Sequence, residues 1–252
     1  MRSSALLLTL ALAGHAFGSS GTVSLSPAVV MLRGEAGQST TQTFVVRNGT
    51  SRSMTFTPEA EDVVVRNGVR SFEAAGVNAA SIAATAVFSE RSVTVPAGES
   101  AAVTVTVTLP PDTGNRAVRA LLRGSDRIMN GSAAATFSLG ALLTFSLSDE
   151  IAMSAEPLIV QPQTATRNLS VTQTCTNSGR EPFVARGALA VIDSRGQLAG
   201  KAALVPHRLL PGERAELGAE YTAELVPGRY RVIVSYDYDG HALTQSAEVD
   251  VK

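Results

Sequence analysis

The sequence contains a single cysteine, no tryptophan and few aromatic residues of any kind. Cys175 is the one cysteine among 252 residues, and aromatic residues make up 5% of the chain. A lone cysteine excludes an intramolecular disulfide, so an exported domain of this chain must be held together by its own hydrophobic core. Cys175 lies in phase with Leu169 and Val171 in the stretch LSVTQTC. This phase predicts a buried small side chain, with an intermolecular or reactive thiol as the alternative.

The chain also has almost no net charge and few histidines. The chain carries 21 Lys and Arg residues against 22 Asp and Glu residues, and its formal net charge is -1. Such a balance gives no reason to expect nucleic acid or a charged membrane surface as a partner. His207 and His241 are isolated from each other and from the cysteine, which argues against a metal site. Nucleophile-elbow, P-loop and dinucleotide motifs are missing too. We therefore predict no enzyme activity, no cofactor, no metal and no small-molecule substrate.

The first eighteen residues have the pattern of a secretory signal peptide. Arg2 precedes an apolar stretch at 5–13, and AFG at 16–18 is a small-x-small cleavage signature before a polar SSG. The segment is too short and wrongly flanked to span a bilayer, and the alternative is an uncleaved N-terminal anchor. We expect cleavage after about Gly18 and an exported mature chain.

Short runs of alternating apolar and polar residues fill the remainder, separated by Gly, Pro and Asn in the manner of β-sandwiches. The strands predicted in the first half are residues 22–32, 41–47, 53–57, 62–66, 69–73, 92–95, 101–109, 116–123 and 134–148. Those in the second half are residues 158–161, 168–176, 183–193, 198–205, 214–221, 229–238 and 242–251. Asn67-Gly68 predicts a type I′ hairpin turn. The acidic cluster EAED at 59–62 is interpreted as a solvated loop, and the Ala-rich piece at 74–86 as a crossover with a helical turn.

A faint internal repeat indicates two copies of one fold. FVVRNGTSRSMTF parallels QTCTNSGREPFVA, and VPAGES parallels LPGERA. The first copy is longer by the Asn67-Gly68 hairpin. We therefore predict an all-β chain of two tandem immunoglobulin-like β-sandwich domains, residues 19–150 and 151–252, after the signal peptide at 1–18. LVPGRY in the second copy resembles the tyrosine corner of such sandwiches, with Tyr230 in a structural role.

The stretch TFSLGALLTFSLSD alternates strictly over its whole length, which is a β signal because successive side chains point to opposite faces. Its apolar row consists of Phe137, Leu139, Ala141, Leu143, Phe145 and Leu147. The opposite row consists of Thr136, Ser138, Gly140, Leu142, Thr144, Ser146 and Ser148. The apolar row covers either the core of its own domain or a partner.

The order of the motifs resembles that of the PapD-like periplasmic pilus-assembly chaperones. TVSLSPAVVMLRGEAGQSTTQTFVVRN is similar to their opening strands, VTVPAGESAAVTVTV to the turn before strand E, and LPPDTGNRAVRALLRG to the approach to strand F. TFSLGALLTFSL resembles strand G, while LLPGERA and VPGRYRV extend the likeness into the second domain. The resemblance implies two immunoglobulin-like domains and donor-strand complementation, in which strand G pairs with a subunit that lacks its last strand.

For this chain the resemblance implies a periplasmic chaperone that assists assembly of pilus or other surface-fibre subunits by donating strand 134–148. The apolar row from Phe137 to Leu147 would bind the subunit, and an outer-membrane usher would be a further partner. Family members clamp the subunit's C-terminal carboxylate with a basic pair on strands A and G, but strand 134–148 has no Lys or Arg. The candidate anchors are therefore Arg33, Arg119 and Arg123. The alternative is a structural or adhesive immunoglobulin-like protein whose apolar row faces its own core.

Overall fold

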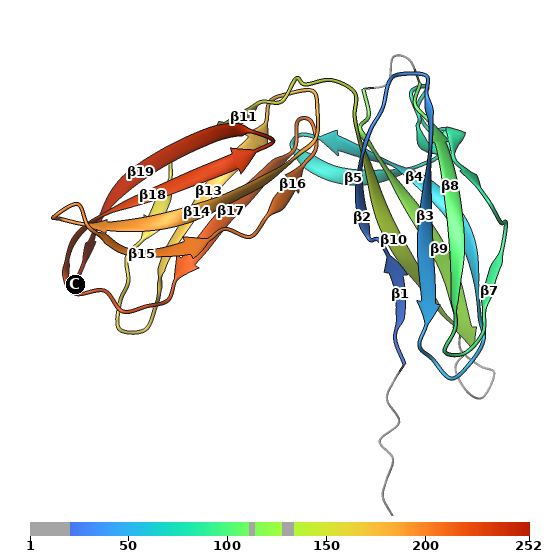
Figure 1. Ribbon diagram of the computed structural model, residues 1–252, viewed down its shortest axis with the longest axis horizontal. Coiled ribbons are helices and arrows are strands. Elements are labelled where there is room, and N and C mark those ends of the chain that lie inside the picture. The colour runs from blue at the N-terminus through green and yellow to red at the C-terminus, as the bar shows by residue number, and fades with distance from the viewer. Residues whose placement is uncertain (1–20, 111–113, 128–133) are drawn as a thin grey trace, which may run out of the picture.

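The computed structural model describes residues 21–110, 114–127 and 134–252, in which β-strands are the main secondary structure (Figure 1). The predicted all-β class is confirmed, and the described residues contain one 3₁₀ turn, Ala83–Thr85, besides the strands. The predicted signal peptide at 1–18 lies outside them. The strands of the first half are β1 Val23–Ser26, β2 Val29–Arg33, β3 Ser39–Asn48, β4 Met54–Arg66, β5 Val69–Ala74, β6 Val87–Phe88, β7 Val93–Val95, β8 Ser100–Thr108, β9 Ala117–Arg127 and β10 Ala134–Ser146. Those of the second half are β11 Met153–Ala155, β12 Ile159–Gln161, β13 Leu169–Asn177, β14 Phe183–Asp193, β15 Leu198–Ala203, β16 His207–Leu209, β17 Arg214–Tyr221, β18 Gly228–Tyr238 and β19 His241–Val251.

The strands form four sheets, and no sheet of the described residues mixes strands from the two halves. The first half holds the sheets β1-β3-β8-β6 and β2-β10-β9-β4-β5, with β7 on β4. The second half holds β11-β13-β12, with β17 on β13, and β15-β14-β18-β19, with β16 on β14. Figure 1 shows the halves as two lobes, one blue to green and one yellow to red. We propose that each pair of sheets is one domain, divided within residues 147–152.

The predicted single strand at 22–32 is wrong, because the chain changes sheets in its middle. β1 pairs with β3 antiparallel, whereas β2 pairs with β10 parallel, from Val29 opposite Leu142 to Arg33 opposite Ser146. Ser26-Pro27 lies between the two strands, and proline cannot donate to a sheet ladder. As a result β2 covers only the C-terminal part of β10.

The predicted loop at 59–62 is also wrong, because β4 runs through it without a break. Glu59 and Glu61 lie on the outer face of the sheet and pair with arginines of the neighbouring strand β9. Arg119 binds Glu61, and Arg123 binds both Glu59 and Glu61. The acidic residues therefore form a cross-strand charge ladder, which stabilises a strand in the way that opposite charges on facing positions do.

Asp62, the last residue of that acidic cluster, faces inward and is fully buried. Its carboxylate accepts the backbone N–H groups of Ile82 at 2.9 Å and Ala83 at 3.0 Å, together with the hydroxyl of Ser81. These donors open the 3₁₀ turn, so the buried carboxylate stabilises the start of a helical turn. The helical turn predicted within residues 74–86 is confirmed.

The internal repeat has a physical basis in two buried asparagines that end equivalent strands. In the first domain Asn48, at the end of β3, is 0% exposed. Its side-chain amide donates to the carbonyl oxygens of Arg52 at 2.6 Å and Val95 at 3.0 Å. Its backbone N–H donates to the carbonyl oxygen of Glu99, in VPAGES, at 2.9 Å.

Asn177, at the end of β13, repeats this arrangement in the second domain and is likewise 0% exposed. Its amide donates to the carbonyl oxygens of Glu181 at 2.8 Å and Leu209 at 3.1 Å. Its backbone N–H donates to the carbonyl oxygen of Glu213, in LPGERA, at 2.9 Å. Both copies thus use one asparagine to join a strand end, the following turn and the Pro-Gly turn.

We expect Asn177→Ala to lower the free energy of unfolding by about 2–3 kcal/mol, because it leaves buried carbonyls without donors. It also removes the acceptor of the Gly179 N–H. Urea unfolding measures the loss. Asn168→Ala is the control, since the Asn168 amide makes one long, exposed contact with Glu220. Equal losses at the two positions would contradict the role of the buried asparagine.

Two further predictions about single residues are confirmed. The Tyr230 hydroxyl donates to the backbone carbonyl of Val226 at 2.6 Å, as expected of a tyrosine corner. Cys175 is fully buried in the core of the second domain. Burial raises the pKa of its thiol, which disfavours the reactive thiolate.

Candidate functional site: the edge of β10 and the cleft beside it

The apolar row of β10 faces the core of its own domain. Ala141, Leu143 and Phe145 are at most 1% exposed, while Phe137, Leu139 and Leu147 are half-buried. The prediction was that the row is at least partly available to a partner; the three central residues lie in the core of their own domain, and binding of a subunit by the row stays a prediction. The physical reason for the burial is that a small two-sheet domain without a disulfide needs the inward row of every strand to fill its core.

Phe137 is held against its own sheet by a glycine on the neighbouring strand. Gly124 of β9 lies opposite Phe137 in the ladder, and a Cβ atom on Gly124 would lie 2.6 Å from the tip of the ring. The ring also packs edge-on against Phe56, with centroids 5.9 Å apart. Because Gly124 has no side chain, the ring of Phe137 can lie over it and cover the end of the core.

The backbone of β10 is open along residues 136–141, which we call the free edge. β9 pairs with this segment on one side, and the ladder with β2 on the other side begins only at Leu142, whose N–H donates to Ala28 at 2.9 Å. Thr136, Ser138 and Gly140 form the exposed row of the free edge. An edge of this kind presents unpaired N–H and C=O groups, which are the groups that strand addition uses.

A cavity of about 260 Å³ lies where the free edge ends, and we call it the cleft cavity. β2 begins beside it, and the outer face of the sheet forms its floor. Its lining includes Ala28, Arg70, Phe72, Arg119 and Gly140. Strand addition along the free edge would therefore place one end of the added segment at an opening lined by arginines.

The three predicted anchors each have a carboxylate partner already. Arg33 pairs with Asp149, and Arg119 and Arg123 pair with the glutamates of β4. Of the three, only Arg119 lines the cleft cavity, where its guanidinium stacks on Phe72 at 3.4 Å from the ring centroid. The structure thus brings Arg119 and Arg123 together and leaves Arg33 elsewhere.

Sequence reasoning missed Arg208, which reaches the first domain from β16 of the second. Its guanidinium donates to the hydroxyl of Thr144 on β10. It makes no ion pair within the described part of the chain, whereas its neighbour Arg70 pairs with Glu213 at 2.8 Å. Burial, and then the charge of Arg70, lower the pKa of Arg208. No local pattern marks this residue, because only the arrangement of the two domains brings it to β10.

The linker between the domains, residues 147–152, is held in place by a buried carboxylate. Glu181 is 0% exposed and accepts hydrogen bonds from Arg116 Nε at 3.1 Å, the backbone N–H of Leu147 at 3.0 Å and the hydroxyl of Ser148 at 2.8 Å. The carboxylate belongs to the second domain, whereas Arg116 precedes β9 of the first domain and the other two donors directly follow β10. This contact holds the two domains together on the linker side.

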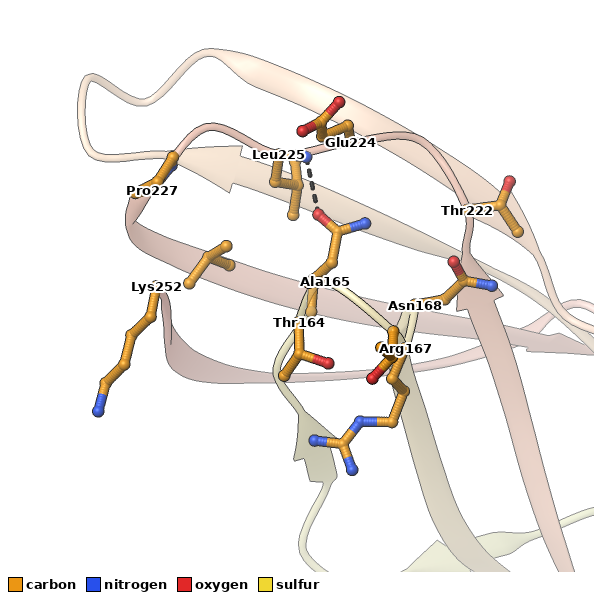
Figure 2. Close-up of a pocket in the computed structure, with 12 residues that line it drawn as sticks. Thr164, Ala165, Arg167, Asn168, Thr222, Glu224, Leu225, Pro227 and Lys252 are labelled. Atoms are coloured by element: carbon orange, nitrogen blue, oxygen red, sulfur yellow. Dashed lines mark hydrogen bonds between the residues drawn. The ribbon is translucent and has the colours of Figure 1, made fainter.

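A larger hollow of about 670 Å³ lies in the second domain at the end that holds the C-terminus, away from the cleft (Figure 2). Gln163 joins its two walls by accepting the backbone N–H of Leu225 at 2.7 Å. Exposed polar side chains such as Thr164, Arg167 and Glu224 surround it. No group of three or more metal-ligating side chains occurs among the described residues, nor does a helix long and apolar enough to cross a membrane.

Comparison with known proteins gives matches to a domain family and to solved structures. The model of the Fn3-like domain matches residues 30–124. The search of curated proteins finds no match. Among solved structures, the class 5 fimbriae chaperone CfaA is 13% identical, with 92% of this chain and 99% of that chain covered and a TM-score of 0.45. A chain of the complex between the SafA pilin and the SafB chaperone of Salmonella enterica is 11% identical, with 91% and 98% covered and a TM-score of 0.45. A chain of the CsuC-CsuE chaperone–adhesion subunit complex of Acinetobacter baumannii is 10% identical, with 90% and 98% covered and a TM-score of 0.43.

Proposed function

We propose that this chain is a chaperone-like binding protein that holds an extended segment of an exported subunit along the free edge of β10. One observation carries the proposal: the free edge leads to the cleft cavity, and beyond the cavity Arg208 binds Thr144 of β10 and makes no ion pair within the described chain. The class of partner, subunits of a pilus or another surface fibre, follows from the order of motifs in the sequence. The periplasm as location rests on the signal-peptide pattern.

The course of β2 favours one direction for the bound segment. β2 runs parallel to β10 and occupies the positions beside Leu142–Ser146. A segment that pairs with the free edge parallel to β10, as β2 does, has to end before Ala28. Ala28 and β2 already occupy the edge of β10 from Leu142 onward. Its C-terminal carboxylate would then arrive at the cleft cavity, next to which Arg208 is in contact with the lining residue Arg70 and can offer charge-assisted hydrogen bonds.

Donation of side chains is confined, in this proposal, to the distal part of the strand. Phe137 and Leu139 lie on the free edge and are only half-buried, so they can turn toward a partner at lower cost than Leu143. The central residues of the row stay in the core of the first domain. An outer-membrane usher remains a predicted further partner.

The test uses a short synthetic peptide of alternating valine and threonine, with either a free or an amidated C-terminus. We expect the free acid to bind about tenfold or more tightly than the amide, the effect of one or two charge-assisted hydrogen bonds. Arg208→Ala should remove this difference. Calorimetry or fluorescence anisotropy measures the affinities.

Arg229→Ala is the matched control, since Arg229 pairs with Glu248 on the surface of the second domain. It should leave both affinities unchanged. Equal binding of acid and amide to the unsubstituted chain would contradict the carboxylate anchor. No binding of either peptide would contradict strand addition itself.

A second candidate is a structural or adhesive immunoglobulin-like protein without chaperone activity. The observation that favours it is the burial of Ala141, Leu143 and Phe145 in their own core. Under this alternative Arg208 only stabilises the contact between the domains, so Arg208→Ala lowers stability and no peptide binds.

A further inference from the structure

We infer that the β4–β5 hairpin is a brace that fixes the angle between the two domains. The prediction that this hairpin is extra in the first copy is wrong, because the second domain has the hairpin β14–β15 in the equivalent place of its sheet. In Figure 1 it extends from the first lobe toward the second, where β16 lies. This inference rests on contacts between the domains and is independent of the proposed function.

The tip of the hairpin is bonded to the backbone of the second domain. The carbonyl oxygen of Gly68 accepts the N–H of Arg214, the first residue of β17, at 2.8 Å. Gly68 has a φ of +80°, and a Cβ atom there would lie 3.0 Å from the Cβ of Arg214. The Asn67-Gly68 turn therefore serves both the hairpin, through its positive φ, and a close approach between the domains.

Arg70 extends this contact along β5. Its guanidinium pairs with Glu213 at 2.8 Å and donates to the carbonyl oxygen of Arg208 at 3.1 Å. Glu213 is itself largely buried and accepts the backbone N–H of Leu210 at 2.8 Å. One arginine of the hairpin thus holds both the turn at 210–213 and the strand that carries Arg208.

An apolar contact completes the brace. Val63 of β4 and Ala117 of β9 form a buried cluster with Leu210, which is 2% exposed, and Val65 packs against it. Among the hydrophobic clusters of the described residues, this one takes members from both domains, whereas the others each belong to a single domain.

The brace and the Glu181 contact adjoin each other, because Arg116, which binds Glu181, is next in the chain to Ala117 of the apolar cluster. Domains joined by a linker alone are expected to move relative to each other unless their interface is substantial. Here the contacts extend from Glu181 past Leu210 to Arg70 and Gly68 of the hairpin, as one interface. Two domains joined along such an extended interface have little freedom to rotate about the linker.

The experiment measures the distance between spin labels on Glu99→Cys and Arg195→Cys by pulsed electron resonance, in the full mature chain without a partner. Both positions are exposed and lie in different domains, while Cys175 is buried and should not take a label. We expect one narrow distance distribution. The double variant Arg70→Ala/Leu210→Ala should broaden it clearly.

Arg66→Ala is the matched control, because Arg66 pairs with Glu73 inside the same hairpin. It should leave the distribution narrow. A double variant that is folded by circular dichroism and keeps the narrow distribution would overturn the inference. If the double variant fails to fold, Arg70→Gln alone is measured, with a smaller broadening expected, and an unchanged distribution again overturns the inference.

Discussion

Leu143→Glu is expected to abolish the cooperative unfolding transition of the first domain. Leu143 is 1% exposed and packs in a cluster with Val118 and Phe145. The substitution removes the packing of a buried leucine and buries an unpaired carboxylate, each of which costs several kcal/mol. The sum is comparable to the whole stability of an ordinary domain, about 5–15 kcal/mol. A thermal melt followed by circular dichroism measures it.

Ser138→Glu is the control on the same strand, because Ser138 belongs to the exposed row of the free edge. It should change the free energy of unfolding by no more than about 0.5 kcal/mol. Leu139→Glu, at a half-buried position, should lie between the two. A normal melt for Leu143→Glu would mean that the apolar row does not serve the domain's own core, and would favour donation of the full row.

Glu181→Ala is expected to lower the free energy of unfolding by about 3–5 kcal/mol, the usual cost of breaking a buried ion pair by removing one partner. The variant deprives the guanidinium of Arg116, which is 8% exposed, of its buried carboxylate. It also removes the acceptor of the Leu147 N–H. Urea unfolding of the full chain measures the loss.

The comparison variant is Glu150→Ala. Glu150 pairs with Arg180 at 3.6 Å, and both side chains are more than half exposed. An exposed pair of this kind contributes at most about 1 kcal/mol, so little change is expected. A loss at Glu181 no larger than that at Glu150 would contradict the role of the buried carboxylate.

The alternation of side chains predicted most strands, because period-two patterning is local and each strand of a sandwich has one buried face. The local signal failed where a neighbouring strand decides the outcome. Glu59 and Glu61 resemble a loop when read alone, but in the sheet Arg119 lies opposite Glu61, and Arg123 reaches Glu59 from a diagonal position on β9. The break within 22–32 depends on which sheet each part joins, and a sequence pattern carries no such information.

The candidate site could be predicted only in part for a related reason. The alternation at 136–148 identifies an apolar face, but it does not say whether that face covers its own core or a partner, and burial at Leu143 decides this. The contact of Arg208 with β10 could not be predicted from the sequence, since Arg208 lies 64 residues from Thr144 and belongs to the other domain. The Asn67-Gly68 hairpin was predicted from its turn residues, while its contact with the second domain was not.

β2 limits the length of any segment that can pair with β10, because it already occupies the edge from Leu142 onward. It leaves residues 136–141 open, a length of about 20 Å at the rise of a β-strand. A ladder of that length supplies only a handful of backbone hydrogen bonds, each with a net contribution of about 1 kcal/mol. A segment bound by so few hydrogen bonds dissociates readily, and its affinity depends mainly on the contacts at its two ends. The position of Ala28, where the open edge ends, therefore favours transient binding of a segment over permanent assembly.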